Sequence, residues 1–248
     1  MNIRFDIIYE YREMLFDGAK MTLWLTVIAI TVGTFIGLLG AFARTAHSEK
    51  GTLLGRSVAG FFRLLSLIYV TIFRGTPLFV QIFIWHFVWT PMLVHPVDGL
   101  LISGQLAADL RSAYGPFLAG CLALSANSGA YITEIFRAGI QSIDKGQMEA
   151  ARSLGLSYSQ AMRHIILPQA TRRMLPPFGN EFITLLKDSS LVSAIGLAEL
   201  AYTARTISGR FSIYEEPYYA IAIIYLIMTM ILAYLFSFLE KRYRIGSR

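Results

Sequence analysis

Long apolar stretches constrain this chain more than any other feature of its sequence. The two clearest run from about Met21 to Phe42 and from about Tyr218 to Leu239, and neither contains a charged residue. An α-helix of about 20 apolar residues is long enough to cross the hydrocarbon core of a bilayer. Because 55% of the residues are hydrophobic and only 15% are charged, we expect an all-α integral membrane protein rather than a soluble domain.

Three further stretches are candidate membrane spans. One extends from about Leu64 to Val94 and is broken at Arg74-Gly75-Thr76-Pro77. Since proline interrupts a helix, we expect a short helix before the break and the span proper from Pro77. The other two run from about Pro116 to Phe136 and, less clearly, from about Phe178 to Leu200. These stretches predict about five spans, with the two ends of the chain on opposite sides of the membrane.

Small residues mark one face of the first span. Gly33 and Gly37 form a Gly-x-x-x-Gly pair, and Gly40 follows. Such a pair lets a second helix approach closely, although glycine is also frequent in membrane helices without that role. The sequence leaves both readings open.

Basic residues are unevenly divided between the two sides of the predicted membrane. Positive charge is enriched in cytoplasmic loops, so the richer side is expected to be cytoplasmic, with the N-terminus outside and the C-terminus inside. The richer side holds fourteen lysine and arginine residues: Arg44, Lys50, Arg56, Arg63, Arg137, Lys145, Arg152, Arg163, Arg172, Arg173, Lys241, Arg242, Arg244 and Arg248. The other side holds six: Arg4, Arg12, Lys20, Arg111, Arg205 and Arg210.

The segment after the third span is polar and basic, and its sequence predicts a helical hairpin. The residues from Gln147 to Leu154 are good helix formers, and Gly155 would end that helix at the C′ position. Ser157 is a plausible N-cap for a second helix from Tyr158 to Ile166, which Pro168 would then limit. Ala150 and Ala151 would give the first helix a small-residue surface open to another protein.

The same segment carries a recognisable pattern. Glu149-Ala150-Ala151, three residues, Gly155, nine residues, Ile165, one residue and Leu167-Pro168 resemble the signature loop of the inner-membrane permease subunits of ATP-binding-cassette (ABC) importers. Flanking motifs are similar to the branch for histidine, glutamine, arginine and opines: Arg74-Gly75-Thr76-Pro77-Leu78 with Gln81, Glu134 to Ile140, Gly146-Gln147, Leu167 to Ala170, and Leu186 to Leu191. The resemblance extends from about Thr22 to the C-terminus.

This resemblance implies the architecture of a type I ABC-importer transmembrane domain. Residues 1–248 would form one such domain, with its core at about 20–240 and a cytoplasmic coupling loop at 138–177. The subunit would work as a pair, either two copies or two related permeases, in the bacterial inner membrane. The loop would contact a cytosolic ATPase dimer, and an extracytoplasmic binding protein would deliver a polar amino acid. The implied coupling residues are Glu149, Ala150, Ala151, Gly155, Ile165, Leu167 and Pro168.

The sequence itself supports a division of labour between subunits. No phosphate-binding loop of the form G-x-x-x-x-G-K-[ST] occurs in it. We therefore expect no enzymatic activity and no cofactor in this chain, with ATP and magnesium bound by the partner ATPase. The four histidines match no metal-site spacing.

Polar residues within the predicted spans are candidates for the substrate pathway, because ionisable groups are costly there. Asn127 and Glu134 lie seven residues apart and would share a helix face with Tyr131. In a structural alternative, Glu134 pairs with Arg137. The full set of pathway candidates is Arg74, Thr76, Asn127, Ser128, Glu134, Lys187, Asp188 and Ser189.

Two other functions are possible on composition alone. A secondary transporter or channel could use Glu134 and Asp188 for ion coupling, but such transporters are often built from two repeated halves, and we find no internal repeat. A membrane enzyme would need a catalytic cluster near one interface, and none stands out in the sequence.

Overall fold

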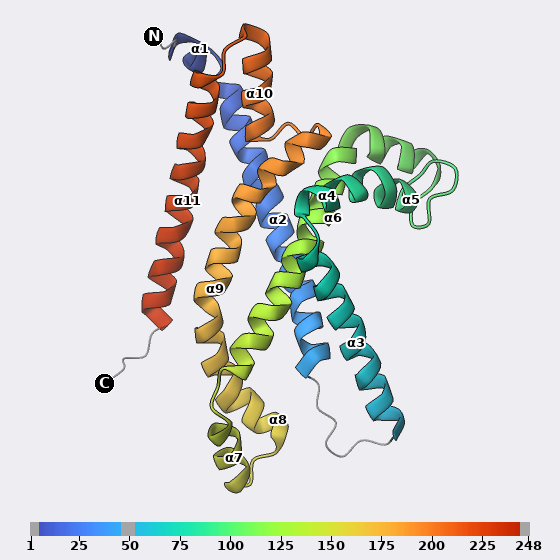
Figure 1. The fold of residues 1–248 in the computed structure, drawn as a ribbon, viewed down its shortest axis with the longest axis vertical. Coiled ribbons are helices and arrows are strands. Elements are labelled where there is room, and N and C mark those ends of the chain that lie inside the picture. Colours follow the sequence, from blue (N-terminus) through green and yellow to red (C-terminus); the bar gives the residue numbers. More distant parts are fainter. Residues whose placement is uncertain (1–4, 46–52, 244–248) are drawn as a thin grey trace.

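The computed structural model describes residues 5–45 and 53–243, and the regular elements in these ranges are helical apart from an isolated bridge between Val94 and Ile102 (Figure 1). In chain order the helices are α1 (Phe5–Glu10), α2 (Arg12–Thr45), α3 (Leu53–Gly75), α4 (Leu78–Ile84), the π-helical turn η1 (Trp85–Trp89), α5 (Thr90–Leu93), α6 (Gly104–Gln141), α7 (Lys145–Ser153), α8 (Tyr158–Ala161), the π-helical turn η2 (Met162–Ile166), α9 (Leu167–Asp188), the 3₁₀ helix η3 (Ser189–Ile195), α10 (Leu200–Phe211) and α11 (Glu215–Tyr243).

The long helices lie side by side and alternate in direction (Figure 1). Helices α2, α6 and α11 run from the end that carries α1 and α10 towards the end that carries α7 and α8, and α3 and α9 run back. The chain therefore enters and leaves the bundle at opposite ends. The hairpin of α7 and α8 projects beyond the bundle at its lower end in Figure 1.

Three helices in the described part of the chain are long and apolar enough to cross a membrane: α2, α3 and α11. The expectation that the second span begins at Pro77 was wrong. The membrane-length helix is α3, which precedes the break, and the apolar segment after it, Leu78–Leu93, is shorter. Arg56 and Arg63 made the sequence before Leu64 look like a loop. Arginine can reach the interface along its aliphatic stem while the helix continues.

The third and fourth expected spans are helical but have different bounds. Helix α6 already begins at Gly104, and Pro116 lies inside it. Helix α9 ends at Asp188, and the chain continues as η3 until Gly196, whose φ of +88° ends the helical path. The arrangement of five spans stays a prediction. Arg4, Lys50, Arg244 and Arg248 of the charge count lie outside the described residues.

The glycine face of α2 packs directly against α6, which confirms the close-approach reading. A Cβ atom placed on Gly37 would lie 2.5 Å from Cγ2 of Ile132, and one on Gly33 would lie 3.2 Å from the backbone nitrogen of Gly129. At Gly40 it would lie 2.5 Å from Oγ1 of Thr133. At Gly37, where the added atom would also lie 2.7 Å from Cβ of Ile132, even an alanine requires a shift of α2 or α6.

A buried carboxylate joins three helices at the end of the bundle that carries α1 and α10. Glu199 is fully buried and caps α10 by accepting a hydrogen bond from the backbone nitrogen of Tyr202 at 2.8 Å. Its other oxygen accepts hydrogen bonds from the Tyr225 hydroxyl at 2.8 Å and from Oγ1 of Thr22 at 3.3 Å. The one side chain thus joins α2, α10 and α11, a role that no local sequence pattern indicates.

The segment between α3 and the core of α6 forms a lateral arm. Helices α4 and α5 run out from the bundle and the first turns of α6 run back (Figure 1). At the turn, the backbone nitrogen of His95 donates to the carbonyl of Ile102 at 3.1 Å. The stretch from about Thr90 to Ala113, for which the sequence indicates no role, therefore lies in this arm, with α5 at its start and the first turns of α6 at its end.

Candidate functional site

The predicted turn at Gly155 has the geometry that the sequence indicated. Gly155 has a φ of +84°, in the left-handed region that favours glycine. The Gly155 nitrogen donates to the carbonyl of Arg152 at 3.0 Å, and the Leu156 nitrogen donates to that of Ala151 at 3.2 Å. This pair of bonds is the Schellman motif. It ends α7 and turns the chain sharply into the next helix.

The start of the second helix is also confirmed. Ser157 and Gln160 form a complete capping box, in which each side chain accepts a hydrogen bond from the other residue's backbone nitrogen. The expectation that Pro168 limits this helix was wrong, because the helical path continues through η2 into α9. The Leu167 nitrogen bonds to the carbonyl of Met162, five residues back. This wider turn places Pro168 in the first turn of α9, where its missing N–H costs little.

The hairpin divides the predicted coupling residues into two groups. Ala151 and Ile165 pack inwards, so Ala150 alone of the alanine pair lies on the surface. Leu154, beside the turn, is 80% exposed. The exposed group is Glu149, Ala150, Gly155, Leu167 and Pro168.

The break between α3 and α4 is held by side-chain amides. Pro77 has no N–H with which to bond the carbonyl of Phe73. Nε2 of Gln81 donates to that carbonyl at 2.8 Å, and Nδ2 of Asn127 donates to it at 3.0 Å. Asn127 also donates to Oε1 of Gln81 at 3.0 Å, and Gln81 donates to Oγ1 of Thr76 at 2.8 Å. Both amide side chains are buried, whereas Arg74 to Pro77 at the break are exposed, so the break is held from its protein-facing side only.

Removing either amide should therefore destabilise the fold. We expect Gln81→Leu and Asn127→Leu each to cost about 1–3 kcal/mol, because each leaves buried polar partners unsatisfied. The double variant should depart from additivity, since both side chains bond the same carbonyl. Thermal unfolding of the purified protein in detergent measures this. The control is Gln105→Leu, whose hydrogen bond to Asp109 is exposed; equal losses in control and test variants would contradict the assignment.

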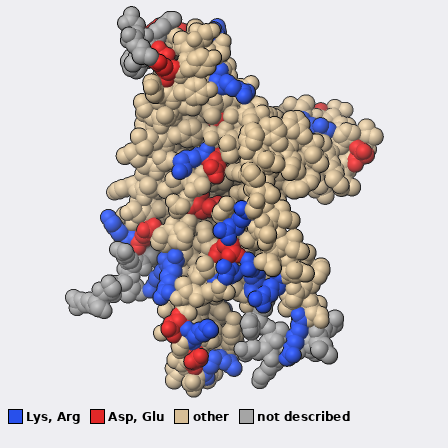
Figure 2. Space-filling view, viewed as in Figure 1, with Lys and Arg blue, Asp and Glu red and all other residues tan. Residues whose placement is uncertain are grey.

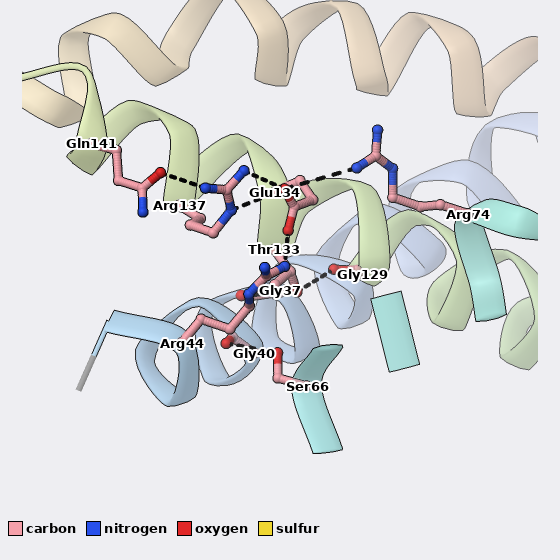
Figure 3. A network of polar contacts seen from close by, with 10 residues as sticks. All are labelled: Gly37, Gly40, Arg44, Ser66, Arg74, Gly129, Thr133, Glu134, Arg137 and Gln141. Atoms are coloured by element: carbon pink, nitrogen blue, oxygen red, sulfur yellow. Dashed lines mark hydrogen bonds and ion pairs between the residues drawn. The ribbon is translucent and has the colours of Figure 1, made fainter. Parts of the chain in front are cut away.

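Glu134 lies at the centre of an arginine cluster (Figure 3). Arg137 binds one carboxylate oxygen through Nε at 2.9 Å and Nη2 at 2.7 Å, which is the pair of the structural alternative. Arg44, from the end of α2, binds the other oxygen. Arg74 approaches to 3.9 Å and lies over the ring of Tyr131, 5.0 Å from its centroid. Asn127, Tyr131 and Glu134 thus share a face of α6 turned towards the α3–α4 break, as the spacing predicted.

The other pathway candidates occupy varied positions. Ser128 is fully buried beside Gly33 in the α2–α6 seam. Ser189 is fully buried, and its hydroxyl bonds to the carbonyl of Leu186. Lys187 is exposed and Asp188 is half-buried, and no salt bridge joins them within the described ranges.

Several charged residues of this region were not identified from the sequence. Arg44 reaches Glu134 from 90 positions away, a contact that no local pattern indicates. Glu181 is half-buried on α9, where it interacts electrostatically with Arg74 and Asp188. The signal for Glu181 was present, since it precedes Asp188 by seven residues and shares its helix face.

The charged residues gather along one face of the bundle. Figure 2 shows acidic and basic side chains gathered down the middle of this face, over α9 and α6. A cavity of about 610 Å³ lies on this face, and its polar lining includes Arg74, Glu134, Arg137 and Arg173. Charged residues within membrane segments almost always face the bundle interior or a water-filled cavity, so such a face suits a water-filled space or a partner rather than lipid.

Comparison with known proteins gives a consistent result. The sequence model of the family described as "Binding-protein-dependent transport system inner membrane component" matches residues 51–245. The glutamine transport system permease protein GlnP of Escherichia coli K12 is 39% identical over 246 residues, covering 99% of this chain and 100% of the relative. The probable glutamine ABC transporter permease protein GlnM of Bacillus subtilis is 36% identical, covering 98% of each chain.

A solved structure agrees with the sequence matches. A chain from a crystal structure of an amino acid ABC transporter with histidines superposes with a TM-score of 0.77 at 37% identity, covering 98% of this chain and 100% of that one. The family model covers most of the sequence, and the relatives match it from end to end. This chain therefore belongs to the family of inner-membrane components of binding-protein-dependent transport systems, the permease subunits of ABC importers.

Proposed function

We propose that this chain is the permease subunit of a bacterial importer for polar amino acids. Two full-length relatives are named for glutamine transport, and the similar solved structure is that of an amino acid transporter. Permease subunits of this family are not enzymes, and ATP is bound and hydrolysed in a separate ATPase subunit. In the proposed assembly, two permeases form the pathway, two ATPases bind on the cytoplasmic side, and a binding protein delivers the amino acid outside.

The proposed orientation places the hairpin of α7 and α8 in the cytoplasm and α1 outside. On the face in Figure 2, most basic side chains lie in the half of the molecule that ends in this hairpin. Cytoplasmic ends of membrane proteins carry the excess of lysine and arginine.

The observation that carries the proposal is the ordered hairpin at this basic end. The Schellman turn at Gly155 presents Leu154, an apolar side chain, at a tip that projects beyond the bundle. An exposed leucine at the end of a helix that also exposes the polar residues Glu149 and Arg152 suits insertion into a cleft of another protein. We propose that the exposed residues of the hairpin contact the ATPase and that Ala151 and Ile165 hold its shape.

We further propose that the charged face of α6 and α9 lines the substrate pathway in the paired permease. The candidates from the sequence that border this face are Arg74, Glu134 and Asp188, and Glu181 joins them. Asn127 and Thr76 support the pathway by holding the α3–α4 break, and Ser128 and Ser189 lie behind it.

Reconstituted transport tests the proposed function. Proteoliposomes containing the permease, its ATPase and the cognate binding protein should take up labelled amino acid only when ATP is present. The test panel is L-glutamine, L-histidine and L-arginine. Uptake that needs an ion gradient and persists without ATP would instead favour a secondary transporter that uses Glu134 and Asp188.

Two substitutions test the proposed pathway. Glu134→Gln and Asp188→Asn should lower the uptake rate while the ATPase still co-purifies, because neither residue lies in the hairpin. Loss of the Glu134 charge leaves the guanidinium groups of Arg44 and Arg137 without the carboxylate that they bind. The control is Asp109→Asn on the exposed lateral arm. Unchanged uptake by both test variants would remove these residues from the pathway.

A further inference from the structure

The cavity on the charged face holds more positive than negative charge. Of its lining residues, Arg74, Arg137 and Arg173 are cationic and Glu134 is anionic. Arg44 adds a fourth guanidinium on the far side of the same carboxylate. Glu181 interacts electrostatically with Arg74, so two carboxylates stand against four arginines and the cluster keeps a net charge of +2.

The hydrogen-bond pattern shows which arginines have donors to spare. Arg44 and Arg137 between them engage both oxygens of Glu134. Arg74 is 3.9 Å from that carboxylate, beyond hydrogen-bonding distance. Arg173 donates to the backbone carbonyl of Ser142, a neutral acceptor. In the part of the chain that the structure describes, neither Arg74 nor Arg173 donates a hydrogen bond to a carboxylate.

We propose that this cavity is a subsite for the free α-carboxylate of the substrate, which Arg173 and Arg74 bind. A guanidinium group presents planar, paired N–H donors that match a carboxylate, and charge-assisted bonds of this kind are stronger than neutral ones. Tyr131, under Arg74, limits the freedom of that side chain. The subsite selects substrates that carry a carboxylate and repels cations that lack one. This inference rests on the proposed function.

Ligand binding to the complete permease–ATPase complex tests the subsite. The complex is prepared in detergent without binding protein or nucleotide. Equilibrium binding is measured for L-glutamine, L-histidine and L-arginine and for the α-carboxamide of each. The wild-type complex should bind at least one acid more tightly than its amide. Arg173→Gln should weaken binding of that acid by about tenfold, with little effect on the amide.

Two further variants separate recognition from folding. Arg172→Gln removes the neighbouring positive charge on α9, which does not line the cavity, and should leave binding unchanged. Arg173→Lys retains the charge without the planar fork and should recover part of the affinity. Co-purification of the ATPase reports that each variant is folded.

Several results would overturn the subsite. These are equal binding of acid and amide by the wild-type complex, no binding of any probe, or equal effects of Arg172→Gln and Arg173→Gln. The cavity is not a substrate subsite if the complex retains phosphatidylglycerol through Arg173 and does not discriminate acid from amide. In that case the arginine cluster binds a lipid headgroup. Uptake in proteoliposomes shows whether the subsite or the proposed function has failed. ATP-driven uptake with no carboxylate preference rejects the subsite alone. Absence of uptake rejects the proposed function.

Discussion

Gly155→Val is expected to reduce ATP-driven uptake by about tenfold or more and to weaken co-purification of the ATPase. The turn needs a φ of +84°, and a β-branched residue held in that region costs about 1–3 kcal/mol. A cost of about 1.4 kcal/mol already changes an equilibrium tenfold. The substitution should therefore shift the hairpin away from the conformation that presents Leu154. Uptake by proteoliposomes and the yield of ATPase on affinity-tagged permease measure the effect.

A matched control separates backbone strain from added bulk. A Cβ on Gly155 would meet no atom within 4 Å, so bulk alone does not disturb the turn. Gly209 in α10 also has open space around it, and its φ is not positive. Gly209→Val should leave co-purification of the ATPase intact. Survival of both uptake and ATPase binding in Gly155→Val would show that the turn does not couple the two subunits.

Gly37→Leu is expected to destabilise the bundle strongly, because it lies at the closest approach of α2 to Ile132 on α6. Its Cβ alone would lie 2.5 Å from Cγ2 of Ile132 and 3.1 Å from the carbonyl oxygen of Gly129. A leucine must push α2 away from α6. Overpacking of this kind costs about 1–3 kcal/mol and occasionally more, and the shift also moves Arg44, at the end of α2, away from Glu134.

Thermal unfolding in detergent and the yield of folded protein measure this loss. Gly60→Leu in α3 is the control, because a Cβ there meets no atom within 4 Å. The control should unfold at the wild-type temperature. If Gly37→Leu unfolds at the same temperature as Gly60→Leu, the seam is not as close as the structure indicates.

Local features of this protein could be predicted from the sequence, and contacts between distant segments could not. The Gly155 turn and the Ser157 cap are set by neighbouring residues, and both were confirmed. The pair of Glu134 and Arg137 is also local, three residues apart on one helix. The contact of Arg44 with Glu134 and the packing of Glu199 against Thr22 and Tyr225 depend on the three-dimensional arrangement, and no periodic pattern indicates them.

Two errors have physical causes. Pro168 was expected to limit the second hairpin helix, but the π-helical turn before it accommodates a residue without an N–H. The second span was expected after Pro77 because the apolar run begins near Leu64, which leaves only a short helix before the break at proline. Helix α3 begins earlier, at Leu53, and includes Arg56 and Arg63, whose long side chains are compatible with the end of a membrane helix.

Cross-linking from the hairpin tests the central claim most directly. Cys121 is the only cysteine and is buried, so a Cys121→Ala background with Ala150→Cys provides one exposed thiol on α7. We predict that this thiol cross-links to the ATPase subunit, that the yield changes when ATP binds, and that Gly209→Cys at the opposite end gives no such product. Absence of any ATPase cross-link from Ala150→Cys, or labelling of that thiol in intact cells by a membrane-impermeant reagent, would contradict a cytoplasmic coupling hairpin.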